Sequence, residues 1–159
     1  MSHFENYQHV SRFYDNTRTA VGVDIIRNQL QNGELPINKQ LLVDAGCGTG
    51  LYSAALVKNV RKIEAIDLNA GMLKIAKEKM KLEGKNGLIN FHISSIDSLP
   101  LDNDTADAVM INQVLHHLPD NLTRGWTHHE KVFREFWRVL KSGGMLIINS
   151  CSPEQIECG

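Results

Sequence analysis

Three glycines at alternate positions, Gly46, Gly48 and Gly50, directly follow a short apolar run at residues 41–45 in the sequence LLVDAGCGTG. Glycine loses more backbone entropy on folding than other residues, and it is favoured where φ must be positive or where another group approaches the main chain closely. The apolar run suits a buried strand, and the sequence LYSAALVKNV after Gly50 favours a helix. This segment therefore predicts a strand, a tight glycine loop and a helix.

The same alternation of strands and helices continues along the chain. Apolar periodicity and turn residues predict helices near residues 21–33, 51–60, 69–84 and 129–140, and strands at 41–45, 62–67, 88–93, 107–112 and 145–149. Asn69 is expected to cap the helix that follows it. Such alternation implies parallel pairing with right-handed crossovers, which gives a doubly wound α/β sheet with helices on both faces. Ligands of these sheets bind at the carboxyl ends of the strands, where the strand order reverses.

The composition bounds the class of protein. The 159 residues, 42% of them hydrophobic, are enough for one domain with one sizeable core. The 17 basic and 18 acidic residues nearly balance, which gives no support for binding to nucleic acid or to an anionic membrane surface. The sequence shows neither an apolar signal core at its start nor a stretch of about 18 consecutive apolar residues. We therefore expect a soluble, cytoplasmic protein without a membrane span.

The three cysteines, Cys47, Cys151 and Cys158, are odd in number and lack the CxxC spacing of metal sites, so we expect reduced thiols. Cys47 lies inside the glycine loop, where a nucleophilic role would require a lowered thiol pKa. Since no basic residue lies nearby in the sequence, we favour the hypothesis of a small side chain tolerated in a tight loop.

The spacing of the glycines argues against two common phosphate-binding loops. A dinucleotide-binding G-x-G-x-x-G motif starting at Gly46 would need glycine or alanine at position 51, where the chain has Leu51. A P-loop would need Gly-Lys-Ser/Thr, but Gly50 is followed by Leu51 and Tyr52. The pattern G-x-G-x-G preceded by Asp44 fits an adenosine ligand without a pyrophosphate better.

Four segments, in this order, resemble the Rossmann-like S-adenosylmethionine-dependent methyltransferases. VDAGCGTG resembles the family's first motif, EAIDLNAGML its second, SSIDSLPLDNDTADAVMINQVLHHL the stretch with the adenine site and the fourth strand, and FREFWRVLKSGGMLIIN the next helix and the fifth strand. The resemblance covers most of residues 14–150 and is closest in style to the ubiquinone- and menaquinone-biosynthesis enzymes, which methylate small molecules. It implies S-adenosyl-L-methionine as the cofactor and a small-molecule methyl acceptor.

The resemblance also implies roles for individual side chains. Asp67 would accept hydrogen bonds from the ribose hydroxyls, the alternative being a charge at a helix N-terminus. Asp97 would accept a hydrogen bond from the adenine amino group while Ile96 packs on the ring, the alternative being an ordinary loop aspartate. Asn112 and Gln113 would lie beside the methionine moiety. The expected cofactor-binding residues are Asp44, Gly46, Cys47, Gly48, Gly50, Asp67, Leu68, Ile96, Asp97, Asn112 and Gln113.

Asp44 precedes the glycines, where it would orient the loop or attract the cofactor's ammonium group through water. For the acceptor, the family places a histidine after the fourth strand toward the substrate cavity, so His116 or His117 would touch it. Tyr14 and Arg18 belong to a segment that resembles a lid over the cofactor, although it is alternatively only the start of an N-terminal helix.

No metal site is expected. Adjacent histidines on a helix point about 100° apart, and no cysteine or carboxylate cluster completes the pairs at 116–117 and 128–129. The expected reaction is in-line transfer of a methyl group from a sulfonium to a nucleophile. In such a reaction, positioning of the reactants and exclusion of water supply much of the acceleration. The sequence names no general base.

The family continues beyond the fifth strand with a further helix and an antiparallel pair of strands, whereas only SCSPEQIECG follows MLIIN here. We expect a shortened form, such as a splice variant or an incomplete gene product, with a helical lid segment at 1–40, a core at 41–150 and a tail at 151–159. Its fifth strand would be an uncovered apolar edge through which a homodimer would form. Two alternatives stay open: a cofactor-binding or dimerising module without turnover, and an NAD-linked oxidoreductase, against which Leu51 counts.

Overall fold

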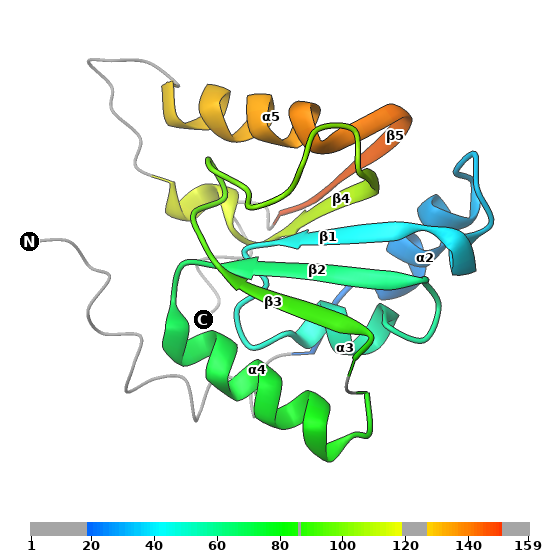
Figure 1. Cartoon of the computed structure of the whole chain (residues 1–159), viewed down its shortest axis with the longest axis vertical. Coiled ribbons are helices and arrows are strands. Elements are labelled where there is room, and N and C mark those ends of the chain that lie inside the picture. Colours follow the sequence, from blue (N-terminus) through cyan, green and yellow to red (C-terminus); the bar gives the residue numbers. More distant parts are fainter. Residues whose placement is uncertain (1–18, 86, 119–126, 151–159) are drawn as a thin grey trace, which may run out of the picture.

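The computed structural model describes residues 19–85, 87–118 and 127–150, which contain a five-stranded parallel sheet (Figure 1). The strands are β1 (Leu41–Ala45), β2 (Lys62–Asp67), β3 (Ile89–Ile93), β4 (Ala106–Asn112) and β5 (Leu140–Asn149). Their order in the sheet is β3-β2-β1-β4-β5, and every neighbouring pair is parallel. The chain moves outward from β1 to β3 and then returns to the other side of β1. The strand order therefore reverses between β1 and β4.

Helices cover both faces of the sheet (Figure 1). α2 (Val23–Gln31), α3 (Leu51–Leu56) and α4 (Ala70–Leu82) pack on one face, and α5 (Thr127–Val139) packs on the other. Two short 3-10 helices, η2 (Ile37–Lys39) and η3 (Leu115–His117), precede β1 and follow β4. The predicted doubly wound α/β fold is confirmed.

Alternation of side chains along the central strands builds one apolar cluster on each face of the sheet. In β1, Leu42 belongs to the cluster that includes Ile26 and Leu30 of α2. The adjacent Val43 belongs to the opposite cluster, which includes Phe136 of α5. All of these side chains are buried, so each helix is held to the sheet by burial of its apolar stripe.

The first described helix, α2, packs against the core through Ile26 and Leu30, whereas its Ile25 and the preceding Val21 are exposed. The side chain of Asn149 donates a hydrogen bond to the carbonyl of Val21 at 3.1 Å, which ties the approach to α2 to the end of β5. Residues 1–18, with Tyr14 and Arg18 of the expected lid, lie outside the described residues, as does the expected tail at 151–159.

Helix α4 shows the expected cap and the expected apolar stripe. The side chain of Asn69 accepts hydrogen bonds from the backbone N–H groups of Gly71 and Met72, at 2.9 and 3.2 Å. The cap satisfies two donors that the first turn leaves without a helical partner. The buried residues of the helix are Met72, Leu73, Ala76 and Met80.

The start of β5 differs from the expectation. The sequence predicts a turn at residues 142–144 before a strand at 145–149, but β5 already begins at Leu140. Leu140 pairs with Ala106 and Met145 pairs with Ala108, so the intervening residues bulge out of the ladder. Gly143 supplies the positive φ of +76° inside this bulge. The predicted start of the strand at residue 145 is therefore wrong, because Leu140 pairs with β4 directly after α5, and residues 142–144 belong to the bulge that follows this first contact.

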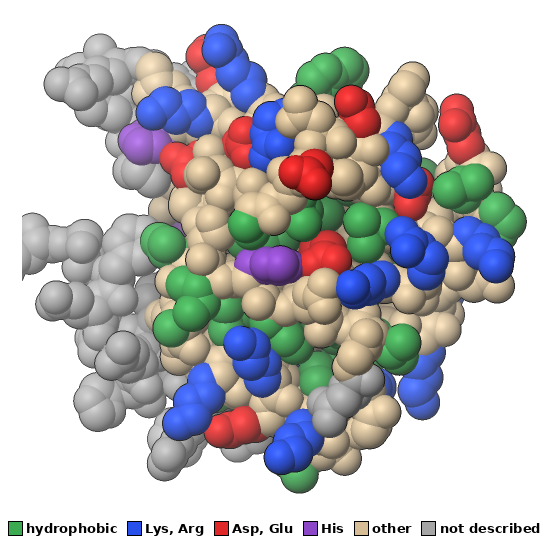
Figure 2. Space-filling view, in the orientation of Figure 1, with side chains coloured by type: hydrophobic (Ala, Val, Ile, Leu, Met, Phe, Trp, Pro, Cys, Tyr) green, Lys and Arg blue, Asp and Glu red, His purple; other side chains and the backbone are tan. Residues whose placement is uncertain are grey.

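β5 lies at one edge of the described sheet and carries apolar side chains, as predicted. Leu146 is 37% exposed and Ile148 is 47% exposed, and Trp137 on α5 is 83% exposed. On the face shown in Figure 2, charged side chains of both signs are interspersed with apolar ones, in keeping with the balanced composition. Within the described part of the chain, no helix combines the length and the apolar character needed to span a bilayer.

Candidate functional site

Three segments that are distant in sequence meet at the carboxyl edge of the sheet. β1 lies between β2 and β4, and its last residue, Ala45, pairs with Ile66 on one side and Ile111 on the other. The strands therefore end level with one another. The loop after β1, the end of β2 at Asp67 and the end of β4 at Asn112 surround the point where the strand order reverses. This is the crevice in which ligands of open α/β sheets bind.

Asp67 fastens the glycine loop to the end of β2. One carboxylate oxygen accepts a hydrogen bond from the backbone N–H of Gly48 at 2.7 Å, and the other accepts from the N–H of Asn69 at 2.8 Å. The N–H groups of Gly46 and Cys47 both donate to the carbonyl of Ile66, at 2.8 and 2.9 Å. Because each carboxylate oxygen can accept a further hydrogen bond, Asp67 can still receive hydroxyl donors. Asn69, rather than Asp67, caps α4.

The three loop glycines all have positive φ, but their surroundings differ. A Cβ atom at Gly46 would lie 2.6 Å from Val114, and one at Gly50 would lie 3.2 Å from Ala76. At Gly48, no atom of the described chain lies within 4 Å of that position. Protein side chains therefore occupy the space that a Cβ atom would need at Gly46 and Gly50. Only Gly48 leaves open space.

Asp44 lies beneath the loop and is 2% exposed. The hydroxyl of Ser53 on α3 donates to its carboxylate at 2.6 Å. The pKa of Asp44 is raised from the ordinary 3.8 to about 7, mainly by burial and in smaller part by the charge of Asp67, against the opposing effect of the hydrogen bond from Ser53. Two acidic groups, Asp44 and Asp67, therefore lie around the loop, and in their ionised forms they would favour a cationic ligand.

Cys47 is buried, and burial together with the negative charges of Asp44 and Asp67 raises the pKa of its thiol well above the ordinary value. A reactive cysteine needs the opposite, an environment that lowers the thiol pKa. The structure therefore supports the prediction that Cys47 is a small side chain packed in the loop.

At the end of β4, the amide of Asn112 is buried without a partner. The residue is 7% exposed, and neither its amide nitrogen nor its amide oxygen has a hydrogen-bond partner among the described residues. A buried polar group without a partner is costly, so this amide has a donor and an acceptor available for a further bound group. The next residue, Gln113, has a positive φ of 56°, and its N–H donates to the carbonyl of Asn149 at 2.8 Å.

The other expected site residues are more dispersed. Ile96 is buried among the side chains of the α5 face, Asp97 is half-buried, and Leu68 is 63% exposed. His116 and His117 lie on the exposed η3, with ring centroids 4.0 Å apart. Within the described residues, no three or more potential metal ligands cluster together.

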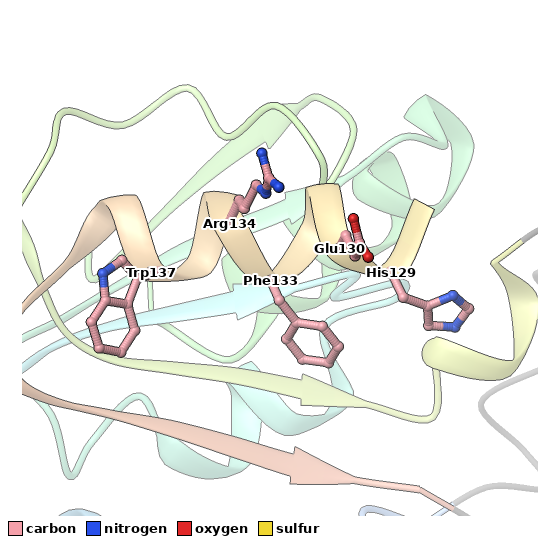
Figure 3. A pocket seen from close by; sticks show the side chains of 5 residues that line it. All are labelled: His129, Glu130, Phe133, Arg134 and Trp137. Atoms are coloured by element: carbon pink, nitrogen blue, oxygen red, sulfur yellow. The ribbon is translucent and has the colours of Figure 1, made fainter. Parts of the chain in front are cut away.

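A hollow of about 580 Å³ lies along α5, apart from the glycine loop. His129, Phe133 and Trp137, spaced four residues apart, point to the same side of the helix, while Arg134 points to the opposite side (Figure 3). None of the expected cofactor-binding residues lines this hollow. The hollow therefore lies beside α5 and is separate from the crevice.

Comparison with known proteins identifies the family. A family model described as "Methyltransferase domain" matches residues 43–148, which run from β1 into β5. The chain therefore belongs to the S-adenosylmethionine-dependent methyltransferase family.

Two curated relatives and one solved structure give the extent of the similarity. The chain is 30% identical over 145 residues to a demethylmenaquinone methyltransferase of Clavibacter sepedonicus, covering 89% of this chain and 55% of the relative. It is 31% identical over 121 residues to the ubiquinone/menaquinone biosynthesis C-methyltransferase UbiE of Escherichia coli, covering 74% and 45%. The chain thus spans about half the length of these relatives. A crystal structure of a proposed S-adenosyl-L-methionine-dependent methyltransferase from Methanococcus maripaludis matches with a TM-score of 0.67 at 25% identity, covering 91% of this chain and 60% of that one.

Proposed function

We propose that this chain binds S-adenosyl-L-methionine in the crevice between β1 and β4 and transfers its methyl group to a small-molecule acceptor in the cytoplasm. The observation that carries the proposal is the convergence of three features at one edge of the sheet. These are the open space beside Gly48, the carboxylate of Asp67 and the buried, unpartnered amide of Asn112.

These residues fit the parts of the cofactor. Asp67 has acceptor capacity for the ribose hydroxyls beyond the two backbone N–H groups that it already binds. The amide of Asn112 supplies both a donor and an acceptor for the methionine end, next to Gln113. Asp97 and Ile96, which follow β3, are assigned to the adenine.

When bound, the cofactor supplies an electrophilic methyl group on a positively charged sulfonium. The residues of the chain hold the reactants in line and exclude water. The carboxylate of Asp67 would stabilise the positive charge of the ligand, and Asp44 would add to this effect only where its own carboxyl is ionised. His116 and His117, exposed beyond the end of β4, are assigned to contact with the acceptor. The quinone-biosynthesis relatives support a small-molecule acceptor.

A second candidate function is a cofactor-binding module that dimerises without turnover, and the exposed apolar edge at β5 favours it. Two copies related by a two-fold axis would pair their β5 strands antiparallel and bury Leu146 and Ile148. Sedimentation of the wild-type chain and of Ile148→Lys tests this. A dimer that dissociates in the variant supports the module, and a concentration-independent monomer rejects it.

Calorimetric titration with S-adenosyl-L-methionine tests the proposed function, with Asp67→Ala as the variant and NAD as the control ligand. Asn69→Ala is the matched control, because it removes a neighbouring cap without removing the carboxylate. Saturable binding that is lost only in Asp67→Ala supports the cofactor site and justifies screening of acceptors. Absence of binding by a wild-type chain that circular dichroism shows to be folded would refute the site.

A further inference from the structure

The segment between β3 and β4, residues 94–105, contains Ile96 and Asp97 but no helix or strand. A short turn orders its beginning, since the hydroxyl of Ser94 donates to the carbonyl of Ser98 at 2.7 Å. The later part of the segment rests against α5, where Leu99 is 4% exposed. The conformation of residues 94–105 therefore depends on the side chains of α5 that contact this segment.

Arg138, near the end of α5, is the main anchor of the segment. Its guanidinium donates to the carbonyl of Leu101 at 2.8 Å, to the side-chain oxygen of Asn103 at 2.9 Å and to the carbonyl of Leu99 at 3.0 Å. It also donates twice to Glu135, from Nε and from Nη2, both at 2.8 Å. A guanidinium has five N–H donors, so this environment satisfies every one of them.

Glu135, one helical turn before Arg138 on α5, also binds the segment. One of its carboxylate oxygens accepts a hydrogen bond from the backbone N–H of Leu99 at 2.8 Å as well as from Arg138. The hydrogen bond from Arg138 lowers the pKa of Glu135, which keeps the pair charged. A two-point pair of this kind fixes geometry as well as adding stability. Both backbone polar groups of Leu99 are therefore held by the same pair of side chains.

We propose that Glu135 and Arg138 are positioning residues for the adenine side of the cofactor site. By fixing the backbone from Leu99 to Asn103, they would set the position of Ile96 and Asp97 earlier in the same segment. This inference rests on the proposed function. It assigns a role in cofactor recognition to two side chains of a helix that does not itself touch the cofactor.

The test compares S-adenosylhomocysteine with S-inosylhomocysteine, in which a carbonyl replaces the adenine amino group. The variants are Arg138→Ala and Arg138→Lys, because lysine keeps the charge but cannot form the five-donor fork. Arg134→Ala is the matched control, since Arg134 lies one turn earlier on the same helix and is exposed. Hydrogen exchange of residues 94–103 is measured on the same samples, and circular dichroism checks that each variant is folded.

We expect the wild-type chain and Arg134→Ala to prefer S-adenosylhomocysteine by about tenfold or more. In Arg138→Ala the ratio of the two dissociation constants should fall toward one, and in Arg138→Lys it should lie between the wild-type value and one. The amides of residues 94–103 should lose protection from hydrogen exchange in Arg138→Ala. Equal weakening of both ligands with an unchanged ratio would overturn the inference, because it would indicate a purely structural role. If the wild-type chain binds neither ligand, the proposed function fails, and with it the adenine role. Hydrogen exchange still decides whether the pair orders the segment.

Discussion

Replacing Asp44 with asparagine should remove a pH dependence of stability that the buried carboxyl creates. Asparagine has nearly the same shape, and its amide oxygen can still accept the hydroxyl of Ser53, so packing and the hydrogen bond are retained. What disappears is the ionisable group. Asp67 on β2 and Cys47 in the loop are the titratable groups that interact with this carboxyl, and the substitution leaves both in place.

The sign and size of the effect follow from the pKa of Asp44. Burial raises it from 3.8 to about 7, so between these values the folded chain holds a proton that the unfolded chain has released. The resulting stabilisation is fully present below the unfolded-state pKa and is lost as the pH rises through the folded-state pKa. Each pH unit corresponds to about 1.4 kcal/mol. Between about pH 5 and a folded-state pKa near 7, the wild-type chain should therefore lose about 3 kcal/mol relative to Asp44→Asn.

Urea denaturation of both proteins at about pH 5 and about pH 8 measures this difference. Other groups, the histidines among them, titrate in the same range, so the quantity to compare is the difference in unfolding free energy between the two proteins at each pH. The variant should gain stability relative to the wild type as the pH rises. Parallel stability profiles would refute the argument, because they would mean that Asp44 is ionised at both pH values.

Three further substitutions separate packing from ligand binding. In urea melts, Gly46→Ala should destabilise the chain more than Gly48→Ala, because the alanine Cβ at position 46 would lie 2.6 Å from Val114 whereas the space at position 48 is open. Gly48→Ala should lower the unfolding free energy only by the backbone strain, about 1–2 kcal/mol. Asn112→Leu should leave the unliganded chain equally stable or about 1 kcal/mol more stable in urea melts, since it removes an unpartnered amide, while calorimetry should show weaker S-adenosyl-L-methionine binding. Asn69→Ala should lower stability by about 1 kcal/mol through loss of the α4 cap, with cofactor affinity unchanged in the same titration.

For each of these three predictions, a specific outcome would contradict the reasoning. Equal destabilisation by the two glycine variants would mean that Val114 moves freely away from the loop, and the double variant Gly46→Ala/Val114→Ala should then recover nothing. Unchanged cofactor affinity in Asn112→Leu would place the ligand elsewhere. A large loss of affinity in Asn69→Ala would show that the start of α4, rather than Asp67, controls the site.

Local signals predicted much of this fold. β2 runs from Lys62 to Asp67 as the apolar pattern indicates, and Asn69 caps α4 as its side-chain chemistry favours. Such features depend on residues within one or two turns of each other, which the sequence displays directly. The parallel, doubly wound sheet follows from the alternation of strands with helices, because right-handed crossovers leave few arrangements.

Contacts between distant segments could not be predicted in the same way. Val114 occupies the space beside Gly46, and Ser53 on α3 binds Asp44 on β1. These contacts depend on how the loop after β4 and the helix after the glycines settle on the sheet, and no local pattern encodes that. In the sequence, Arg138 is likewise an ordinary charged residue near the end of a helix. Only the structure shows that it binds the backbone of the segment before β4.

The position of β4 beside β1 also governs when the site comes into existence. A growing chain would acquire the glycine loop and Asp67 early, but Asn112 joins them only after β4 has inserted next to β1. Ligand affinity would then appear when β4 inserts beside β1 rather than accumulate strand by strand. By mass action, a ligand present at a hundred times its Kd would stabilise that completed arrangement by about 2.7 kcal/mol. If it binds Asp67 and Asn112 as proposed, the cofactor would link the ends of β2 and β4 across β1.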